Sequence, residues 1–466
     1  MTNQRGKGRA AAAVAALCTL AALQSQGAQG AEAANGAQPH RPYRADSAVR
    51  ADGAVRADSA VRADGAVRVD TPYRYDPRAQ PVTGAATGEG APRLAAGGVY
   101  RSAVGPDAKA YFQVDLGGTG DAYVSAVAVP RPDTKVAFGD GIELTLQDRD
   151  GNTCDTGRAL FGSPEYPRPI AAYVSRGLTG KRTSCQAAGL YNVLVQRIGD
   201  AASAPGEWGL ELRHTSEPRV TGDVPTYPPT HWSTAAPPAP SSAPRTARGG
   251  TGFADAPRLS GGAWRDTLRP GSTLFYRVPV GWGQQVFATA ELGRAGGGGS
   301  GYVAPAIDLQ LYNPALGPVV DAYTGYDGKP ASVALQPLAP VAYENRNSTW
   351  GTVGALRFGG DYYLAVSLSP KVARALGPGT YPVTLRVGVR GEARPAPAYE
   401  GAAPDFAATG RTPASSPAAA PRRHDGGSTK MRLLAAAGIG TGTLLVVWLG
   451  VRTLVARRRE QPVRPG

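Results

Sequence analysis

Ala91-Pro92-Arg93-Leu94 returns later in the chain as Ala256-Pro257-Arg258-Leu259, and the residues that follow each copy match in the same order. Ile142-x-Leu144-x-Leu146, for example, is matched by Ile307-x-Leu309-x-Leu311. The offset between the copies grows only from 165 residues at the first motif to 173 at the last, as small loop insertions would produce. The sequence therefore predicts a duplicated domain rather than one large enzyme.

Each copy has the pattern of a β-sandwich. Ile142, Leu144 and Leu146 alternate with polar residues, which places apolar side chains on one face of a strand. Turn signals such as Asp150-Gly151 separate similar short runs. The only helix that we expect in the two copies is Pro370–Leu376. The predicted fold class is all-β: two tandem antiparallel jelly-roll-like β-sandwiches joined by a Pro-rich linker, plus one C-terminal transmembrane helix.

The two ends of the chain resemble a secretion signal and a membrane anchor. Basic residues precede the apolar run Ala10–Leu23, and Ala31–Ala33 offers a small-x-small cleavage site. Leu433–Val451 is a run of 19 residues without a charge, followed by arginines that favour the cytoplasmic side. We therefore predict a single-pass type I protein of the cell membrane with extracellular domains. A sortase signal at Phe406–Gly410 is the alternative for the tail, and Gly438–Gly442 has a spacing that would also allow helix dimerisation.

Composition divides the chain further. Four hexads of Arg-Ala-Asp-Ser/Gly-Ala-Val precede the first copy, and prolines fill the segment between the copies, so we expect the two domains to lie apart with some freedom. The predicted segments are a signal peptide (1–33), a disordered spacer (34–90), sandwich 1 (91–215), a Pro-rich linker (216–255), sandwich 2 (256–390), a Pro/Ala-rich stalk (391–432), the transmembrane helix (433–451) and a basic cytoplasmic tail (452–466).

The charge of the chain does not indicate nucleic-acid binding. Of the formal net charge of +14, residues 1–33 carry +2 and residues 411–466 carry +8, which leaves +4 for the exported part. The basic residues thus set membrane topology rather than form a phosphate-binding surface. The excess of Ala, Gly, Pro and Arg over Lys suggests a high-GC, actinobacteria-like bacterial genome. Cys154 and Cys185 form an even pair in the exported part, which predicts a disulfide in sandwich 1.

Four motifs in the copies resemble a known family: Tyr-Phe-x-Val at Tyr111–Val114, Ile-x-Leu-x-Leu-x-Asp-x-x-Gly at Ile142–Gly151, Gly-x-Tyr-Tyr-x-x-Val at Gly360–Val366 and Gly-x-Tyr-x-Val-x-Leu at Gly379–Leu385. Together the copies resemble the bacterial pre-peptidase C-terminal family. The resemblance implies a jelly-roll-like sandwich that is non-catalytic and is involved in binding, solubility or secretion. Members of that family usually accompany a peptidase domain, and the rest of this chain is too short and too irregular to contain one.

The residues that carry chemistry are few, and we predict no catalytic residues and no cofactor. Three of the four histidines, His40, His231 and His424, lie in predicted linkers and His214 ends a strand, so neither a catalytic triad nor zinc-ligand spacing is indicated. Asp148, Asp150 and Asn152 could bind calcium, although a tight hairpin turn explains them as well and the matching turn Asn313–Gly317 lacks the acids.

A ligand-binding loop is the remaining candidate site. Tyr323 and Tyr326 flank a predicted turn beside Asp327, and binding residues concentrate in such loops, although packing of the tyrosines in the core or turn is the alternative. We predict a non-catalytic binding or scaffold protein that engages the membrane through its C-terminal helix and binds a protein partner or a cell-wall polysaccharide, with no nucleic acid. The alternative is an accessory subunit of a membrane-bound secretion or peptidase complex.

Overall fold

The computed structural model describes residues 73–406, except positions 133, 179–184, 200–205, 224, 239–242, 298 and 405. The chain divides into two parts, residues 1–63 and 64–466, and every described residue lies in the second part. The predicted signal peptide, the hexad repeats, the transmembrane helix and the basic tail lie outside the described residues. No helix within the described part combines the length and the apolar character needed to cross a membrane.

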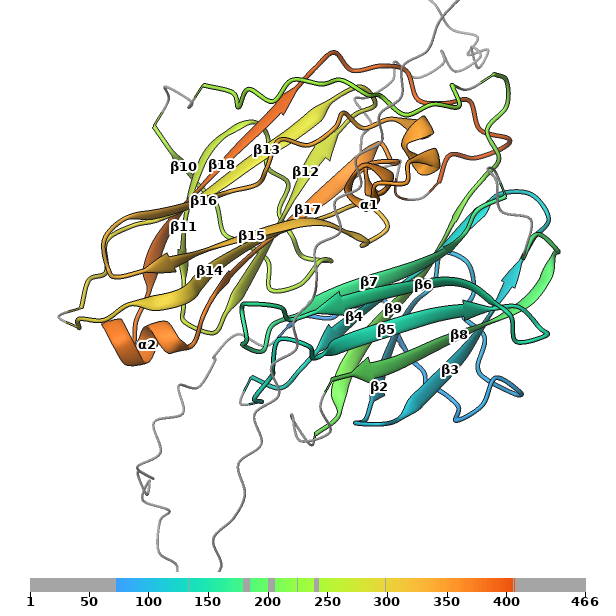
Figure 1. The fold of residues 1–466 in the computed structure, drawn as a ribbon, viewed down its shortest axis with the longest axis horizontal. Helices are drawn as coiled ribbons and strands as arrows, with labels where there is room; N and C mark the ends of the chain where they lie inside the picture. Colours follow the sequence, from blue (N-terminus) through green and yellow to red (C-terminus); the bar gives the residue numbers. More distant parts are fainter. Residues whose placement is uncertain are drawn as a thin grey trace, which may run out of the picture. The chain divides into compact units, whose positions relative to one another are not determined.

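The first copy folds into two facing β-sheets (Figure 1). One sheet has the strand order β1-β2-β9-β4-β7 and the other has the order β3-β8-β5-β6. The strands are β1 (Gln80–Pro81), β2 (Val99–Val104), β3 (Lys109–Leu116), β4 (Asp121–Val129), β5 (Gly141–Gln147), β6 (Thr153–Leu160), β7 (Ile170–Arg176), β8 (Gly189–Ile198) and β9 (Trp208–Glu217).

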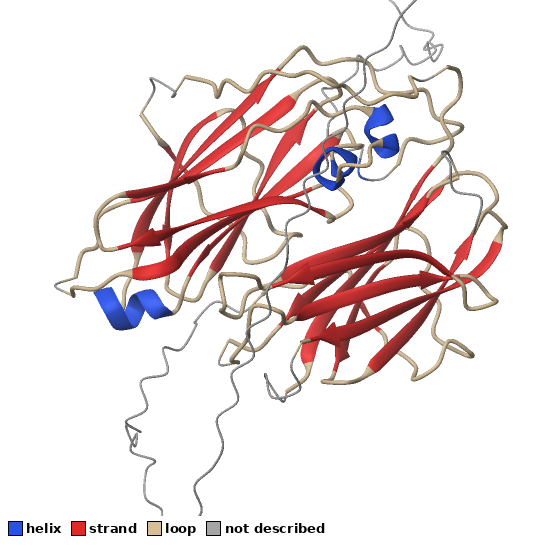
Figure 2. Ribbon diagram, in the orientation of Figure 1, coloured by secondary structure: helices blue, strands red, loops and turns tan. Residues whose placement is uncertain are grey.

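The second copy repeats this arrangement and adds three short helical segments, which stand out against the strands in Figure 2. Its sheets have the orders β10-β11-β18-β13-β16 and β12-β17-β14-β15. The elements are β10 (Arg245–Thr246), β11 (Gly262–Leu268), β12 (Thr273–Val280), β13 (Gln285–Leu292), β14 (Val303–Tyr312), β15 (Pro318–Tyr326), β16 (Ala331–Ala334), the 3₁₀ helix η1 (Tyr343–Asn347), α1 (Gly351–Ala355), β17 (Gly360–Leu368), α2 (Lys371–Leu376) and β18 (Tyr381–Arg390).

The duplication predicted from the sequence is confirmed strand by strand. Strands β1 to β9 take the same places in the sheets as strands β10 to β18, in the same order. Pairing of early with late strands, β2-β9-β4-β7 facing β3-β8-β5-β6, is the jelly-roll arrangement. Among the named strands, all pairings are antiparallel except those that the first strand of each copy makes, because β1 pairs parallel with β2 and β10 pairs parallel with β11.

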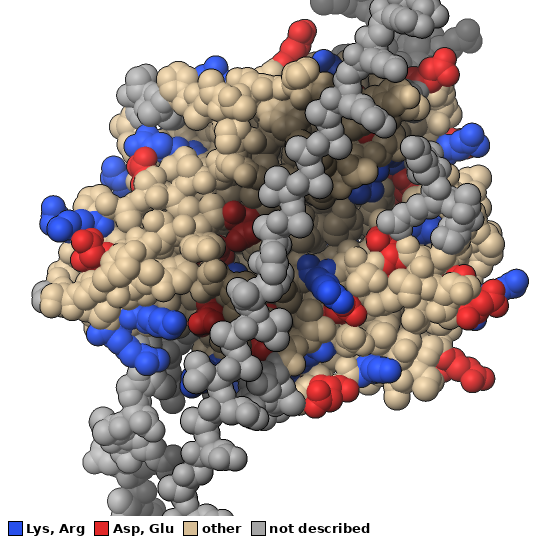
Figure 3. Space-filling view, in the orientation of Figure 1, with Lys and Arg blue, Asp and Glu red and all other residues tan. Residues whose placement is uncertain are grey.

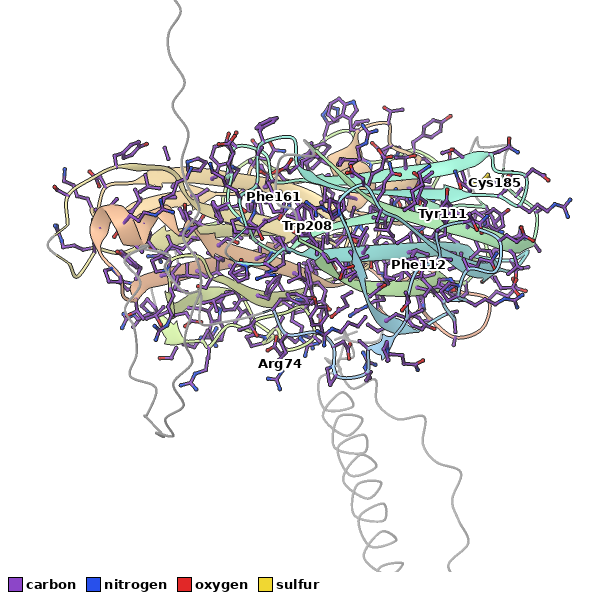
Figure 4. The ribbon with its side chains drawn as sticks, turned by 90° about the horizontal axis from the view of Figure 1, so that it is seen from below. Arg74, Tyr111, Phe112, Phe161, Cys185 and Trp208 are labelled. Atoms are coloured by element: carbon purple, nitrogen blue, oxygen red, sulfur yellow. A yellow bond between two sulfur atoms is a disulfide. The ribbon has the colours of Figure 1, made fainter. Side chains whose placement is uncertain are left out.

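Alternating strands supply the core of each sandwich. Ile142, Leu144 and Leu146 on β5 are 0%, 0% and 2% exposed, as the alternation with polar residues predicts. Figure 4 shows Phe161 and Trp208 close together within the first sandwich, where their rings make an edge-to-face contact with centroids 5.5 Å apart. Such aromatic pairs remove a large apolar area from water and fix the spacing between the sheets.

The structure corrects the predicted boundary between the spacer and sandwich 1. Gln80–Pro81 lies within the predicted spacer 34–90, yet it pairs with Tyr100 and Arg101 of β2. Tyr73 and Asp76 are already buried. The fold therefore includes residues from 73 onwards. A composition rich in Gly, Thr and Pro did not reveal this strand, because its hydrogen-bond partners come from β2 rather than from its own neighbourhood.

The predicted linker and stalk also contribute residues to the folded part. Arg245–Thr246 of the predicted linker 216–255 pairs with β11, and Phe253 is only 2% exposed. In the predicted stalk 391–432, Tyr399 forms an isolated bridge with Val220 of the linker. Proline-rich segments can therefore follow the surface of a domain in an extended conformation instead of separating the domains.

The predicted helix at Pro370–Leu376 is confirmed as α2, which begins one residue later. The segments η1 and α1 were missed. Each is five residues long and shows no apolar repeat, so local sequence offers no helical signal. Their position depends on tertiary contacts: the side chain of Asn345, 0% exposed, donates hydrogen bonds to the carbonyl groups of Pro340 and Leu356.

The predicted disulfide is confirmed. Cys154 on β6 bonds to Cys185, with an S–S distance of 2.01 Å and a sequence separation of 31. Both cysteines are partly buried against the core of the first sandwich. Figure 4 marks Cys185. The second copy contains no cysteine, so the bond belongs to the first sandwich alone.

Replacing both cysteines by alanine should lower the free energy of unfolding by about 3 to 4 kcal/mol, because the bond restricts the unfolded chain by closing a loop of roughly 32 residues. Chemical denaturation of the purified full-length chain measures this loss. Wild-type protein kept reduced should unfold at the same denaturant concentration as the variant. A variant as stable as the oxidised wild type would show that the bond contributes nothing.

Candidate functional site at the junction of the two sandwiches

The two sandwiches pack against each other through a shared apolar cluster. Val127 of β4 and Ala171 of β7 contact the side that carries Phe275 of β12 and Tyr312 of β14. Phe253 lies in the same cluster, with its ring centroid 4.7 Å from that of Phe275. This contact corrects the expectation that the linker holds the domains apart. A strand such as β4 is therefore buried on both faces.

A buried ionic cluster connects the sandwiches at one place in the junction. Arg346 of η1 donates to Asp121 at 2.7 Å and to both oxygens of Glu217 at 3.0 and 3.1 Å. Tyr123 and Tyr399 donate their hydroxyl groups to Glu217 at 2.8 and 3.1 Å. We call these five residues the Arg346 cluster. The side chain of Arg346 is only 3% exposed, so its charge depends on its partners rather than on water.

The protonation state of the Arg346 cluster follows from its geometry. Burial alone would lower the pKa of Arg346, but Tyr123, Glu217 and Asp121 together hold this pKa above its usual value. Burial also raises the pKa of Tyr123 well above its usual value, with Glu217 and Asp121 acting in the same direction. The arginine therefore stays charged and the tyrosine stays neutral across the physiological pH range.

A second ion pair connects the sandwiches elsewhere in the junction. The Nε atom of Arg168, in the loop before β7, lies 3.0 Å from a carboxylate oxygen of Asp308 on β14. The two side chains are 5% and 1% exposed. The same guanidinium group donates to the carbonyl groups of Phe161 and Pro164, both at 2.9 Å. Burial raises the pKa of Asp308 to about 6, although Arg168 acts in the opposite direction.

A polar cavity of about 640 Å³ opens at this junction and takes its lining from both copies. Sandwich 1 and the segment before it contribute polar side chains from Asp76 and Arg78, and from Arg213 and His214 of β9. The lining from sandwich 2 includes Arg277 of β12 and Asp361 and Tyr363 of β17, and aromatic rings complete the wall. Neither sandwich alone would form this cavity.

Charges in the cavity wall are mostly paired within their own copy. Arg78 donates to both carboxylate oxygens of Asp76, at 3.1 and 2.8 Å. Asp361 lies between two guanidinium groups, 3.2 Å from Arg258 and 3.4 Å from Arg277. Arg213 has weaker ionic contacts than these, because its Nη2 atom is 3.8 Å from the nearest carboxylate oxygens.

Arg213 also reaches across the junction. Burial raises the pKa of the Tyr363 hydroxyl, and the adjacent Arg213 guanidinium partly offsets this effect. Glu211, on the same strand as Arg213, accepts a hydrogen bond from the backbone of Asp76 at 2.8 Å. Burial raises the pKa of Glu211, with Arg213 acting in the opposite direction. Arg213 of β9 thus lies beside Tyr363 of β17, across the junction.

His214 lines the cavity as a neutral side chain. Its Nδ1 atom lies 2.9 Å from the carbonyl oxygen of Leu94, and a carbonyl only accepts, so Nδ1 carries the proton. The Nε2 atom is then an acceptor, and it has no hydrogen-bond partner among the described residues. Burial lowers the pKa of this histidine, while its hydrogen bond to Leu94 acts in the opposite direction.

His214 should make the chain sensitive to acid. Its pKa is about 6.5 in an unfolded chain and lower in the fold, so its stabilising effect is complete above pH 6.5 and falls as the pH decreases. We expect wild type to lose more stability between pH 7 and pH 5 than a His214→Gln variant does. Denaturation at both pH values measures the difference. Equal losses in the two proteins would show that His214 does not titrate on unfolding.

The predicted calcium ligands form a hairpin turn between β5 and β6. The carboxylate of Asp148 accepts hydrogen bonds from the backbone of Asp150 at 3.0 Å and of Asn152 at 2.8 Å. Asn313 makes the corresponding bonds in the second copy, to the backbone of Ala315 at 3.0 Å and of Gly317 at 2.9 Å. The acid and the amide thus perform the same backbone role. These hydrogen bonds are those of a tight hairpin turn, and calcium binding here stays a prediction.

The predicted ligand loop does not present its tyrosines together. Tyr326 is 1% exposed and donates its hydroxyl to Gly293. Tyr323 is 47% exposed, and its hydroxyl hydrogen-bonds Ser163 of the first sandwich at 3.0 Å. Asp327 accepts a hydrogen bond from the backbone of Lys329 at 2.9 Å and closes the turn. Across the described ranges there is no group of three or more His, Cys, Asp or Glu that could hold a metal ion.

No local motif in the sequence indicates the cavity. Asp361 and Tyr363 appeared only as part of a strand motif, and Arg213 and Asp76 drew no attention. One signal was available: residues 122–129 are almost continuously apolar, which is typical of a strand covered on both faces. Such a strand in each copy would have indicated that the sandwiches pack on each other.

No family model and no curated protein matches the chain. Among solved structures, the CUB1-EGF-CUB2 domain of human MASP-1/3 is 7% identical over 62% of this chain and 99% of its own length, with a TM-score of 0.15. The tandem CBM22 domain of Paenibacillus barcinonensis Xyn10C is 10% identical over 64% and 92%, with a TM-score of 0.18. The ANX2 ectodomain of Arabidopsis thaliana is 8% identical over 62% and 82%, with a TM-score of 0.17.

These TM-scores are too low to carry any argument about this chain. The class of protein is defined by the structure itself. Within the described part, the chain is an all-β protein made of two jelly-roll sandwiches that pack on each other and enclose a polar cavity.

Proposed function

We propose that this chain is a non-catalytic, membrane-anchored extracellular binding or scaffold protein of a high-GC bacterium. The observation that carries the proposal is the cavity of about 640 Å³, whose lining comes from both sandwiches. Volumes of a few hundred Å³ with a small number of polar groups are typical of ligand sites, which favour boundaries between domains. The ligand class that we propose is a cell-wall polysaccharide.

The Arg346 cluster and the Arg168–Asp308 pair support this proposal, because they fix the two halves of the cavity against each other. A preorganised binding site loses little conformational entropy when its ligand binds. On the face that Figure 3 shows, acidic and basic residues are interspersed without a large patch of one sign. The apolar runs Ala10–Leu23 and Leu433–Val451 support export and anchoring.

Sedimentation with purified cell wall tests the binding function. The full-length wild-type chain should sediment with the wall, and so should Arg374→Ala, whose arginine is exposed on α2. Arg346→Ala should sediment less, because it weakens the junction that forms the cavity. Wild-type protein that stays in the supernatant would overturn the proposal.

An accessory subunit of a membrane-bound secretion or peptidase complex is the second candidate, and exposed aromatic residues favour it. Trp350 is 69% exposed and Tyr227 is 85% exposed. Their segments are joined by a hydrogen bond of 3.0 Å from Asn347 to the backbone of Thr226. In-cell crosslinking that recovers one stoichiometric membrane partner, and loses it in Trp350→Ala, would favour this candidate. The resemblance to the pre-peptidase C-terminal family fits either role.

A further inference from the structure

Among the described residues in and next to the cavity wall, guanidinium groups outnumber carboxylates by one. Four guanidinium groups lie in or next to the wall, namely Arg78, Arg213, Arg258 and Arg277, together with three carboxylates, Asp76, Glu211 and Asp361. Arg78 holds Asp76 through two hydrogen bonds, and Arg258 and Arg277 share Asp361. Arg213 has only long contacts of 3.8 Å, to an oxygen of Asp76 that Arg78 also holds and to Oε1 of Glu211, which makes no hydrogen bond among the described residues.

The hydrogen-bonding capacity of Arg213 is also incomplete. Its Nε atom is buried and has no hydrogen-bond partner among the described residues. The same holds for the Nε atom of Arg277. Buried donors of this kind are costly unless something satisfies them, and a planar guanidinium group suits a carboxylate through paired hydrogen bonds. The unsatisfied Nε donors of Arg213 and Arg277 therefore offer a place for a carboxylate in the wall.

Unsatisfied acceptors stand beside these donors. Among the described residues, neither carboxylate oxygen of Asp361 makes a directed hydrogen bond, and the Nε2 atom of His214 accepts none. These acceptors call for a ligand with hydroxyl donors. A dianionic phosphate would exceed the surplus of one positive charge among these groups, and a neutral sugar would leave that surplus uncompensated.

We infer that the cavity binds an acidic sugar residue, with its carboxylate on Arg213 and its hydroxyl groups on acceptors of the wall such as Asp361 and His214. The inference rests on the proposed function and deepens it, because it names the class of polysaccharide: one that contains uronic acids. The cavity of about 640 Å³ has room for one or two sugar rings. Aromatic side chains, Phe253 and Tyr363, supply apolar surface for the ring faces.

Isothermal titration of the purified full-length chain tests the inference with three matched probes. Glucuronate carries both the carboxylate and the hydroxyl groups, glucose lacks the carboxylate, and triglycine carries a carboxylate without hydroxyl groups. We expect glucuronate to bind at least tenfold more tightly than either of the others. Arg213→Gln should weaken glucuronate binding about 10- to 100-fold, which is the effect of losing a hydrogen bond to a charged group.

Two further variants complete the test. Arg74→Gln is the control, because Arg74 is largely exposed and does not line the cavity, and it should bind glucuronate as wild type does. Arg213→Lys keeps the charge and should bind with intermediate affinity, which separates loss of the anion site from a general loss of structure. Melting temperatures measured without ligand identify any variant that fails to fold.

Several results would overturn the inference: no binding of glucuronate, equal binding of glucose or of triglycine, or equal affinities of wild type and Arg213→Gln. If one of these results occurs and the full-length chain still sediments with cell wall, the proposed function stands. A chain that binds neither glucuronate nor cell wall would overturn both.

Discussion

Replacing Arg346 by alanine should lower the free energy of unfolding by about 3 to 5 kcal/mol, because it leaves the carboxylates of Asp121 and Glu217 buried without their cation. The carboxylate side chains are 8% and 1% exposed, so water cannot replace the arginine. Denaturation of the full-length chain, followed through the buried Trp208, measures the loss.

Two variants make the result specific to the Arg346 cluster. Arg374→Ala removes an exposed arginine and should change stability by no more than about 0.5 kcal/mol. Adding Asp121→Asn and Glu217→Gln to Arg346→Ala should recover part of the loss, since the buried charges disappear with their partner. If the Arg346→Ala variant proves as stable as the Arg374→Ala variant, the Arg346 cluster does not hold the junction together.

Arg168→Ala should cost a similar amount, about 3 to 5 kcal/mol at pH 8. The substitution removes the cation 3.0 Å from Asp308 and leaves the carbonyl groups of Phe161 and Pro164 without their donors. Because the Arg168 side chain bridges the loop before β7 and strand β14, the loss should affect both sandwiches. Circular dichroism and tryptophan fluorescence should therefore report the same decrease.

The loss in Arg168→Ala should depend on pH. The pKa of Asp308 is about 6 in the fold and about 3.9 in an unfolded chain, so its contribution to stability is complete below pH 3.9 and is lost as the pH rises through 6. Without Arg168 this pKa rises further. The loss of stability in Arg168→Ala should then be smaller at pH 5 than at pH 8. The stability of the double variant Arg168→Ala/Asp308→Asn should differ little between these two pH values. The same deficit at both pH values would contradict this account.

Much of the fold could be predicted from the sequence. The alternation at Ile142–Leu146 gave the strands, the matched motifs gave the duplication, and the even pair of cysteines gave the disulfide. The predicted boundaries failed where the strands were short. Strands β1 and β10 have two residues each, which is too few for a periodic pattern.

The candidate site could be predicted much less well. Tyr323, Tyr326 and Asp327 share a turn in the sequence, yet Tyr326 belongs to the core. The cavity instead combines side chains from Asp76 to Phe406, and no local motif marks them. Aromatic and acidic residues in a loop indicate what chemistry is available, but burial decides which of them a ligand can reach.

By itself, the sequence determined the two jelly-roll sandwiches, because strand alternation and turns depend on neighbouring residues. Only the tertiary structure decided that the sandwiches join and form a cavity. Arg346 meets Asp121 and Glu217 across 225 and 129 positions of the chain, and it does so only when two whole sandwiches exclude water from the three side chains. Removal from water sets the strength of the attraction between these charges. This removal is a property of the packed sandwiches rather than of any segment.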